Sequence, residues 1–492
     1  MNTHELLSCL RFKKINGALP NHITNIHQDS RKVENDTMFI CIRGFTVDGH
    51  EYYKDAIENG ATVILAEEEL KIDSDHVALV IVNSTAKAMA LLANKFFDYP
   101  STKLTTIGVT GTNGKTTVTS LIHSILRNDN QKSALSGSIG LELGKEFYYN
   151  ENTTCDALTN QKMLRKVHDQ GVDHMIMEVS SHGLAQGRLW GIDFDIVVFT
   201  NLTHDHLDYH NTMEQYSNTK SLLFSQLGND LSAFKCLILN EDDPQSNQYK
   251  AVTPFESISY SIENTSDFKA TNIIYKSDMT SFTLHSPEGT YDVEMKLLGK
   301  FNIYNVLAAT ASLYAKGITV ERLVELIKKL SPVNGRMEKV NISAPVTMYI
   351  DYAHTPDAIE KSISSVMPFK KQKIIFLAGT SGDRDRYKRP LMAEKASLAD
   401  YVILTVNDPR FENATTILAD MEQGMQHHHY KSIPDRKKAI THAIEVSEPG
   451  DIIILAGKGQ EEYQIIENKK YPHSDIKIAT EKCLLKYSLN HN

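Results

Sequence analysis

The segment TTIGVTGTNGKTT, residues 105–117, carries the strongest structural signal in the sequence. It combines an apolar strand, a glycine-rich loop and the start of a helix. Gly111 and Gly114 let backbone N–H groups approach phosphate oxygens, the helix presents its positive end, and Lys115 adds a cation. Thr116 is placed to bind a magnesium ion. The first glycine of the GxxxxGK[ST] pattern is replaced, so we interpret the loop as a shortened variant that binds ATP or GTP.

Strand-like and helical stretches alternate on both sides of this segment, which predicts mostly parallel sheets covered by helices. The 492 residues suffice for about three domains of roughly 150 residues each. Breaker clusters fall at residues 98–101 and at Ser331-Pro332. We therefore expect a three-domain α/β architecture. A central phosphate-loop domain with a parallel sheet, residues 100–331, is flanked by two smaller α/β domains, residues 1–99 and 332–492.

The composition is that of an ordinary globular protein, with 41% hydrophobic and 23% charged residues. The 52 Lys and Arg against 61 Asp and Glu give a net charge of −9, which argues against nucleic-acid binding by bulk charge. The five cysteines are scattered and form no CxxC pair, which argues against a disulfide framework or a zinc knuckle. No signal peptide or membrane-spanning run is evident. We expect a cytoplasmic protein that neither inserts into a membrane nor binds nucleic acid.

Polar residues follow two apolar stretches beyond the loop. Glu178 ends the first, and His206 lies just after the second. Ligands bind at the carboxyl ends of parallel strands in open α/β sheets. Glu178 and His206 could therefore complete a magnesium site with Thr116, although imidazole is an unusual ligand for this ion. Lys220, by contrast, is typical of a solvated helix residue when only the sequence is considered.

Three motifs in this order resemble the Mur ligases of peptidoglycan synthesis: TGTNGKTT (110–117), MEVSSHGLAQGR (177–188) and NLTHDHLDYH (201–210). Further matching motifs are DSRK (29–32), GKFNIYN (299–305), NGRME (334–338), DYAHTPDA (351–358) and GDRDRYKRP (382–390). The resemblance extends from residue 30 to residue 464. It is strongest to the members that add the third amino acid to UDP-N-acetylmuramoyl-L-alanyl-D-glutamate.

The resemblance implies an ATP-dependent, amide-forming ligase. Its three domains would bind the UDP group, ATP and the incoming amino acid. The γ-phosphoryl group would move to the D-glutamate carboxylate, and an amino group would then attack the acyl phosphate. The implied partners are these small-molecule substrates, the implied cofactors are ATP and Mg²⁺, and we expect a monomer.

The resemblance also assigns site residues. Those with catalytic roles are Lys115, Glu178, His206, Lys220 and Arg336. Those at the metal are Thr116, Glu178, His206 and Lys220, the last as an N-carboxylated lysine. Those binding ATP are Thr110, Gly111, Thr112, Asn113, Gly114, Lys115, Thr116, Asn302, Asn305, Asp351 and His354. Those binding the UDP-dipeptide are Ser30, Phe45, Thr46, Val47, Thr153, Thr154, Ser180, Gln186 and Arg188. Those binding the amino acid are Arg384, Asn407, Asp408, Pro409, Arg410, Gly457 and Glu461.

The identity of the added amino acid depends on one tetrapeptide. Members that add meso-diaminopimelate carry Asp-Asn-Pro-Arg, whereas this chain has Asn407-Asp408-Pro409-Arg410. Arg410 would bind the distal carboxylate of diaminopimelate, which lysine lacks, so diaminopimelate is favoured. The exchange at Asn407 and Asp408 moves a negative charge by one residue. Lysine or another amino acid therefore remains an alternative.

Two further functions stay open. A folylpolyglutamate synthetase shares the loop and the fold, although the segment at residues 29–32 and Arg410 argue against it. Stimulation of ATP hydrolysis by folate or by the UDP-dipeptide would distinguish the two. A non-catalytic, nucleotide-binding paralogue is supported only by the exchange at Asn407 and Asp408.

Overall fold

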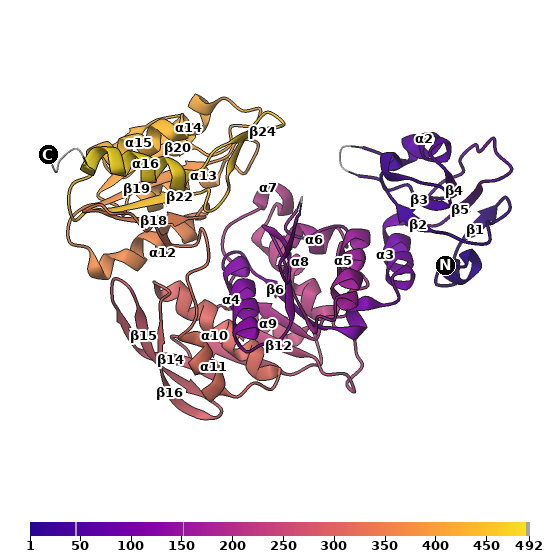
Figure 1. Ribbon diagram of the computed structural model, residues 1–492, viewed down its shortest axis with the longest axis horizontal. Helices are drawn as coiled ribbons and strands as arrows, with labels where there is room; N and C mark the ends of the chain where they lie inside the picture. Colours follow the sequence, from indigo (N-terminus) through magenta and orange to yellow (C-terminus); the bar gives the residue numbers. More distant parts are fainter. Residues whose placement is uncertain (45–46, 151, 489–492) are drawn as a thin grey trace. The chain divides into compact units, whose positions relative to one another are not determined.

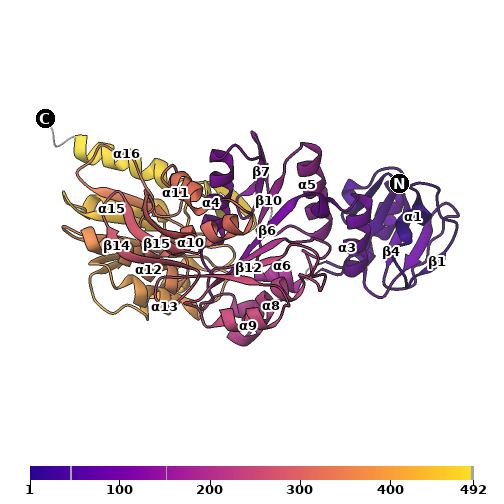
Figure 2. The ribbon, with the colours of Figure 1, turned by 90° about the horizontal axis from the view of Figure 1, so that it is seen from below.

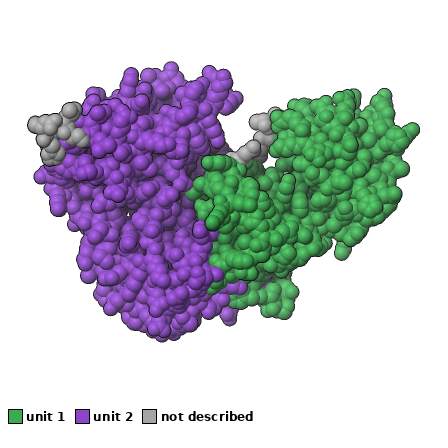
Figure 3. Space-filling view, viewed as in Figure 1, with its two compact units in different colours: residues 1–108, 131–197, 226–235 green, residues 109–130, 198–225, 236–492 purple. Residues whose placement is uncertain are grey.

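The computed structural model describes residues 1–44, 47–150 and 152–488. The chain divides into two compact units (Figure 3). The first unit contains residues 1–108, 131–197 and 226–235, and the second contains residues 109–130, 198–225 and the chain from residue 236 onward. At two places the chain passes from the first unit to the second within a strand. These strands are β6 (Thr105–Thr110) and β11 (Ile196–Phe199).

A five-stranded sheet forms the core of the first hundred residues, in the order β1-β5-β4-β3-β2 (Figure 1). Strands β2 to β5 are parallel, and β1 is antiparallel to β5. Helix α3 packs on this sheet because Ala88, Met89, Leu92 and Ala93 recur at helical spacing and form one buried apolar face. The elements are α1 (Thr3–Leu7), β1 (Lys14–Asn16), β2 (Asn25–His27), β3 (Thr37–Ile40), α2 (Tyr53–Glu58), β4 (Ala61–Ala66), β5 (Ala78–Ile81) and α3 (Thr85–Phe96).

The remaining strands of the first unit lead to Glu178. Strand β10 (His174–Glu178) is parallel to β7 (Ser133–Ser136), and every residue of both strands is buried. The antiparallel strands β8 (Gly140–Leu143) and β9 (Glu146–Tyr149) extend β7. Helices α5 (Ala157–Asp169) and α6 (Ser181–Ala185) complete this part. Glu178 is the last residue of β10, so the expectation that it ends a buried strand is confirmed.

The second unit begins with helix α4 (Lys115–Asn128), which follows the glycine loop directly. Helix α10 (Lys300–Ala315) is buried on nearly all sides, since 11 of its 16 residues are buried. Strands β12, β13 and β14 are parallel, and β15 and β16 are antiparallel additions. The other elements are α7 (Leu207–His210), α8 (Met213–Ser225), β12 (Cys236–Asn240), α9 (Gln245–Ala251), β13 (Ser257–Ser261), β14 (Phe268–Tyr275), β15 (Thr280–Ser286), β16 (Gly289–Met295) and α11 (Val320–Ile327).

The last part of the second unit is a six-stranded sheet in the order β17-β18-β22-β19-β20-β21, with helices on both faces (Figure 2). Side chains alternate along β18, where Tyr349 joins one core with α12, α13 and α14, and Met348 and Ile350 join the other with α15 and α16. Its elements are β17 (Glu338–Lys339), β18 (Thr347–Asp351), α12 (Pro356–Val366), β19 (Ile374–Thr380), α13 (Lys388–Ala396), β20 (Tyr401–Val406), α14 (Ala414–Glu422), β21 (Tyr430–Ser432), α15 (Arg436–Val446), β22 (Ile452–Ala456) and α16 (Asp475–Ser488). A separate two-stranded ribbon consists of β23 (Tyr463–Ile466) and β24 (Lys469–Pro472).

Short 3-10 helices lie at Ser30–Lys32, Gly49–Tyr52, Pro100–Lys103 and Met367–Phe369. In the described part of the chain, no helix combines the length and the apolar character that a membrane crossing requires.

Candidate functional site

The glycine loop is shaped by two residues with positive φ, Gly111 at +149° and Gly114 at +90°. A Cβ atom at Gly111 would overlap with Thr200 Oγ1, and one at Gly114 would lie 2.7 Å from Asn305 Oδ1. Glycine is therefore required at both positions. The side chain of Lys115 folds back over the loop, and its Nζ donates to the carbonyls of Gly111 and Thr112, each at 2.9 Å.

A pocket of about 640 Å³ opens beside this loop within the second unit. This volume is typical of a small-molecule site. The pocket is lined by residues of the loop, of α10, and of the segment from the end of β18 into α12. Those predicted to bind ATP or to act on it are Asn113, Gly114, Asn305, Arg336, Asp351 and His354.

Two asparagines of α10 connect that helix to the pocket. Asn302 Nδ2 donates to the carbonyl of Leu298 at 2.8 Å, and Asn305 Nδ2 donates to Asn302 Oδ1 at 3.1 Å. Both residues are buried. Asn305 therefore has a fixed orientation beside Gly114, at the edge of the pocket.

Arg336 and Asn113 join the loop to the later part of the second unit. Arg336 Nη2 donates to Thr116 Oγ1 at 2.9 Å. Asn113 Nδ2 donates to Asp357 Oδ2 at 2.8 Å. Thr355 begins α12 as its N-cap, since its hydroxyl accepts from the N–H of Ala358. The loop and the first turn of α12 are thus parts of one site.

Asp351 and His354 are held at the end of β18. Asp351 accepts hydrogen bonds from the N–H groups of Met337 and Tyr352 and from the hydroxyl of Ser362. Burial raises the pKa of Asp351. Desolvation lowers the pKa of His354 to about 4, and the nearby Lys388 ammonium acts in the same direction. His354 is therefore a neutral hydrogen-bonding group at physiological pH.

Lys220 is only 1% exposed, so its interpretation as a solvated residue is wrong. Its Nζ donates to the carbonyl of Gly111 at 2.9 Å and lies 4.5 Å from the centre of the Tyr216 ring. Burial, together with the Lys115 ammonium, lowers the pKa of Lys220 well below its usual value. Both effects favour the unprotonated form of this amine, which lies directly behind the phosphate loop.

Most of the residues predicted to bind the UDP-dipeptide come together around Glu178 in the first unit. Ser138 donates to both carboxylate oxygens of Glu178, from its N–H at 3.0 Å and from its hydroxyl at 3.1 Å. Thr154 Oγ1 donates to the Glu178 carbonyl and accepts from the N–H of Ser180. Arg188 Nη1 donates to the carbonyl of Thr154 at 2.8 Å. The other members of this cluster are Thr153, hydrogen-bonded to Ser138, and Gln186, hydrogen-bonded to Arg188.

The other members of the predicted UDP-dipeptide set belong to the first hundred residues. Ser30 is buried, and its carbonyl accepts from Asn59 Nδ2 at 3.0 Å. Val47 is exposed. Phe45 and Thr46 lie outside the described residues.

The residues predicted to bind the amino acid surround the end of β20. Asn407 Oδ1 accepts from Arg436 Nη1 at 2.6 Å, and Asp408 Oδ1 accepts from Lys458 Nζ at 3.0 Å. Glu461 pairs with the same Lys458 at 2.6 Å. The two exchanged positions therefore face different buried cations. Gly457 packs against Asn407, and the Pro409 carbonyl accepts from the N–H of Glu412.

Arg410 and Arg384 are the cations of this region that lack a carboxylate partner among the described residues. Arg410 has a φ of +52°, and its backbone joins Ile466 in an isolated parallel bridge. Its buried Nε finds no acceptor in the described part of the chain. The side chain of Arg384 is exposed.

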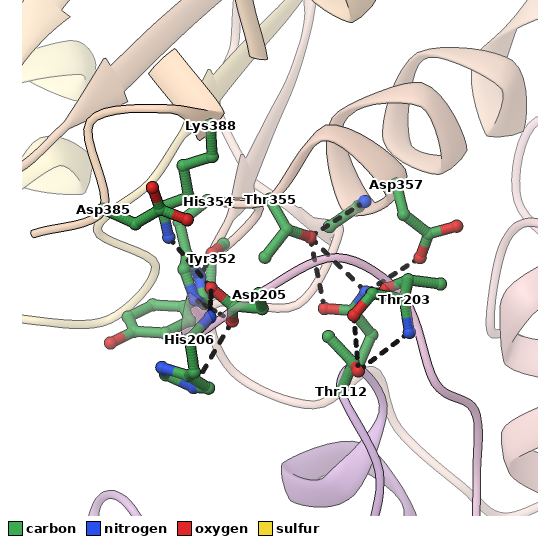
Figure 4. A network of polar contacts seen from close by, with 12 residues as sticks. Thr112, Thr203, Asp205, His206, Tyr352, His354, Thr355, Asp357, Asp385 and Lys388 are labelled. Atoms are coloured by element: carbon green, nitrogen blue, oxygen red, sulfur yellow. Dashed lines mark hydrogen bonds and ion pairs between the residues drawn. The ribbon is translucent and has the colours of Figure 1, made fainter. Parts of the chain in front are cut away.

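Asp205 and Lys388 belong to the site but were not predicted. Lys388 Nζ donates to Asp205 Oδ1 at 3.1 Å (Figure 4). Burial alone would raise the pKa of Asp205, but Lys388, His206 and His354 hold it below its usual value. The available signal was the position of Asp205 beside His206. Lys388 is 183 positions away in sequence, so no local pattern indicates the pair.

A phosphate-binding loop beside a pocket of nucleotide size is typical of an enzyme that uses a nucleotide. Three family models match the chain: "Mur ligase family, catalytic domain" over residues 22–97, "Mur ligase middle domain" over residues 109–313 and "Mur ligase, glutamate ligase domain" over residues 335–459. The chain belongs to the Mur ligase family and is a peptide-bond-forming ligase. The predicted three-domain α/β architecture is confirmed, with three mixed, mostly parallel sheets.

Three relatives match the chain over nearly its full length. UDP-N-acetylmuramyl-tripeptide synthetase 2 of Oceanobacillus iheyensis is 52% identical and covers 98% of each chain. UDP-N-acetylmuramoyl-L-alanyl-D-glutamate–2,6-diaminopimelate ligase of Bacillus cereus is 44% identical, with 98% of each chain covered. UDP-N-acetylmuramoyl-L-alanyl-D-glutamate–L-lysine ligase of Staphylococcus haemolyticus is 42% identical, with 99% of each chain covered. The names of the relatives therefore divide between two amino acids.

Proposed function

We propose that the protein adds meso-diaminopimelate to UDP-N-acetylmuramoyl-L-alanyl-D-glutamate, with ATP as the source of energy. The full-length similarity to tripeptide synthetases supports the UDP-dipeptide as the acceptor. The reaction transfers the γ-phosphoryl group to the D-glutamate carboxylate. The amino group of the third amino acid then attacks the acyl phosphate, which forms the amide bond and releases phosphate.

The observation that carries the choice of diaminopimelate is the state of the Arg410 guanidinium. Its buried Nε lacks an acceptor among the described residues, and a buried donor without a partner is costly. A carboxylate can accept two parallel hydrogen bonds from a guanidinium. Diaminopimelate offers such a carboxylate at the far end of its side chain, and lysine does not.

L-Lysine is the second candidate because two carboxylates share one buried cation nearby. Asp408 and Glu461 both pair with Lys458, which leaves this group with one net negative charge. That charge would attract the terminal ammonium of lysine. The ammonium at the distal centre of diaminopimelate fits the same group, so this cluster alone does not favour lysine.

The nucleotide would occupy the pocket beside the loop. Asn302 and Asn305 are proposed on the adenine side and Asp351 at the ribose. Lys115 and Arg336 would neutralise phosphate charge as it develops during transfer, and their contacts with Gly111 and Thr116 support this role. Neutral His354 can donate or accept a hydrogen bond at the phosphates without adding charge. Of these residues, Asn305, Arg336, Asp351 and His354 line the pocket.

The residues present suit a magnesium ion. Among the described residues, no group of three or more His, Cys, Asp and Glu is arranged to hold a metal. Magnesium usually takes few protein ligands together with water and substrate phosphates, so it does not need such a group. Thr116, His206 and N-carboxylated Lys220, all in the second unit, are the proposed holders, and the metal role of Glu178 in the first unit stays a prediction. When bound, magnesium would supply positive charge that stabilises the phosphates.

N-carboxylation of Lys220 is favoured by its surroundings. The reaction needs an unprotonated amine, which attacks carbon dioxide and loses a proton to give a carbamate. Burial and Lys115 already favour the neutral amine. The carbamate would place an anion next to Lys115, where the unmodified side chain offers no negative charge to a metal ion. That the protein is a monomer in solution and resides in the cytoplasm are still predictions.

The proposal is tested by phosphate release from the purified protein with ATP, magnesium and the UDP-dipeptide. Meso-diaminopimelate and L-lysine are supplied in parallel reactions. Release that depends on diaminopimelate supports the proposal, and release that depends only on lysine replaces it with the second candidate. No release with either amino acid, together with UDP-dipeptide binding, would contradict both.

A further inference from the structure

Asp205 contacts His206 through both of its carboxylate oxygens. Oδ1 accepts a hydrogen bond from the backbone N–H of His206 at 3.0 Å. Oδ2 lies 3.4 Å from Nε2 of the same histidine (Figure 4). The Asp205 side chain is only 3% exposed. One buried carboxylate thus contacts both the backbone and the ring of His206.

His206 has an unusual backbone conformation. Its φ is +55°, in the left-handed region that residues with a Cβ atom seldom adopt. Such residues persist where their surroundings determine the conformation, and they often mark functional sites. The hydrogen bond from the His206 N–H to Asp205 stabilises this backbone, and the second oxygen contacts the ring, which is 40% exposed.

Asp205 is itself held by a residue from a distant part of the chain. Lys388, the first residue of α13, donates to Asp205 Oδ1, and its side chain is only 10% exposed. A second contact joins the same two segments, since His204 Nε2 lies 3.4 Å from Asp385 Oδ2. Residues 203–206 and 383–388 therefore meet at two points, and the second segment contains Arg384.

We propose that Asp205 is a positioning residue that orients His206 toward the magnesium nucleotide, and that Lys388 keeps Asp205 in place. This inference rests on the proposed function, in which His206 helps to hold the metal. A carboxylate behind a metal-binding histidine fixes the ring orientation, and its loss typically weakens metal binding about 10- to 100-fold. Because Lys388 follows Arg384 by four residues, the segment that is expected to contact the amino acid also supports the metal site.

The test measures binding of Mn²⁺, a paramagnetic substitute for magnesium, to the full chain with ADP and bicarbonate. Electron paramagnetic resonance reports free Mn²⁺, so the readout does not depend on turnover. We expect Asp205→Asn to raise the Kd of Mn²⁺ about 10- to 100-fold. Lys388→Met should raise it by a smaller factor. The double variant should match Asp205→Asn, because Lys388 acts through Asp205.

Two controls make the result specific. Lys235→Met removes another buried lysine, which pairs with the half-exposed Asp193 and has no proposed role, and it should leave the Kd unchanged. Asp205→Asn leaves the buried Lys388 without its partner, which can prevent this single variant from folding. In that case the double variant is measured instead, because it removes both charges.

His206→Ala separates this inference from the proposed function. If His206→Ala leaves the Kd of Mn²⁺ unchanged, the metal role of His206 fails, and the positioning role fails with it. If His206→Ala weakens binding but the folded Asp205→Asn and double variants bind within twofold of the parent chain, only the positioning role is overturned.

Discussion

Lys115 provides the cation of the phosphate loop. Its Nζ contacts the carbonyls of Gly111 and Thr112, which places the charge directly over the loop. We expect Lys115→Ala to lower kcat by about 10²–10³-fold or more, since it removes a donor that stabilises the transferring phosphoryl group. UDP-dipeptide binding, measured by calorimetry, should stay within about twofold of the parent. Full turnover in this variant would contradict the assignment of the loop.

Arg410 provides a residue-scale test of amino-acid choice. We expect Arg410→Ala to reduce kcat/KM for diaminopimelate by about 10- to 100-fold, because a hydrogen-bonded carboxylate would lose its partner. The measurement is phosphate release at varied amino-acid concentration. Arg386→Ala is the control, since this exposed arginine already pairs with Asp420. An equal loss with lysine as substrate would show that Arg410 acts on the fold and not on the substrate.

Activity should depend on whether Lys220 carries a carboxyl group. Lys220→Ala removes the group that would be carboxylated, so activity should fall to background. A short carboxylic acid such as acetate should restore part of it, because it can place an anion in the space behind the loop. The measurement is phosphate release with and without added acid. Absence of both effects would rule out the carbamate.

At the scale of an element, the phosphate loop depends on its backbone shape. Gly111→Ala would place a Cβ against Thr200 and force a strained φ, so we expect a rise of about tenfold or more in the KM for ATP. Gly228→Ala is the matched control, because Gly228 has a φ of +89° but open space around its Cβ position. An unchanged KM in Gly111→Ala, with the fold intact, would show that the loop tolerates a different shape.

Elements differ in how much of their role the sequence reveals. The loop of Gly111 to Lys115 and the strand-end position of Glu178 were predictable, because each depends on residues that are close in sequence. The burial of Lys220 was not, since α8 has no marked apolar face and the lysine contacts Gly111, which is 109 positions away in sequence. The Asp205–Lys388 pair joins two segments brought together only by folding. Long-range contacts of this kind leave no periodic pattern to detect.

At the scale of the whole molecule, His354 makes stability depend on pH. Its pKa is lowered from the usual 6.5 to about 4, so the unfolded chain binds more protons than the folded chain between these values. Stability should therefore fall as the pH drops from about 6.5 to about 4. Urea midpoints measured across this range should decrease, and His354→Gln should flatten the decrease. A midpoint that rises on acidification would contradict the lowered pKa.

The exchange of Asn407 and Asp408 has an evolutionary consequence. Position 407 faces Arg436, which already has Asp475 as a partner, while position 408 faces Lys458, which also has Glu461. Reverting one position alone changes the number of buried charges, whereas reverting both keeps that number constant. The effects of the two single changes on stability should therefore not add up to the effect of the pair. The two positions form an epistatic unit, because a mutational path between the two tetrapeptides must cross an intermediate whose number of buried carboxylates differs from that of both end states.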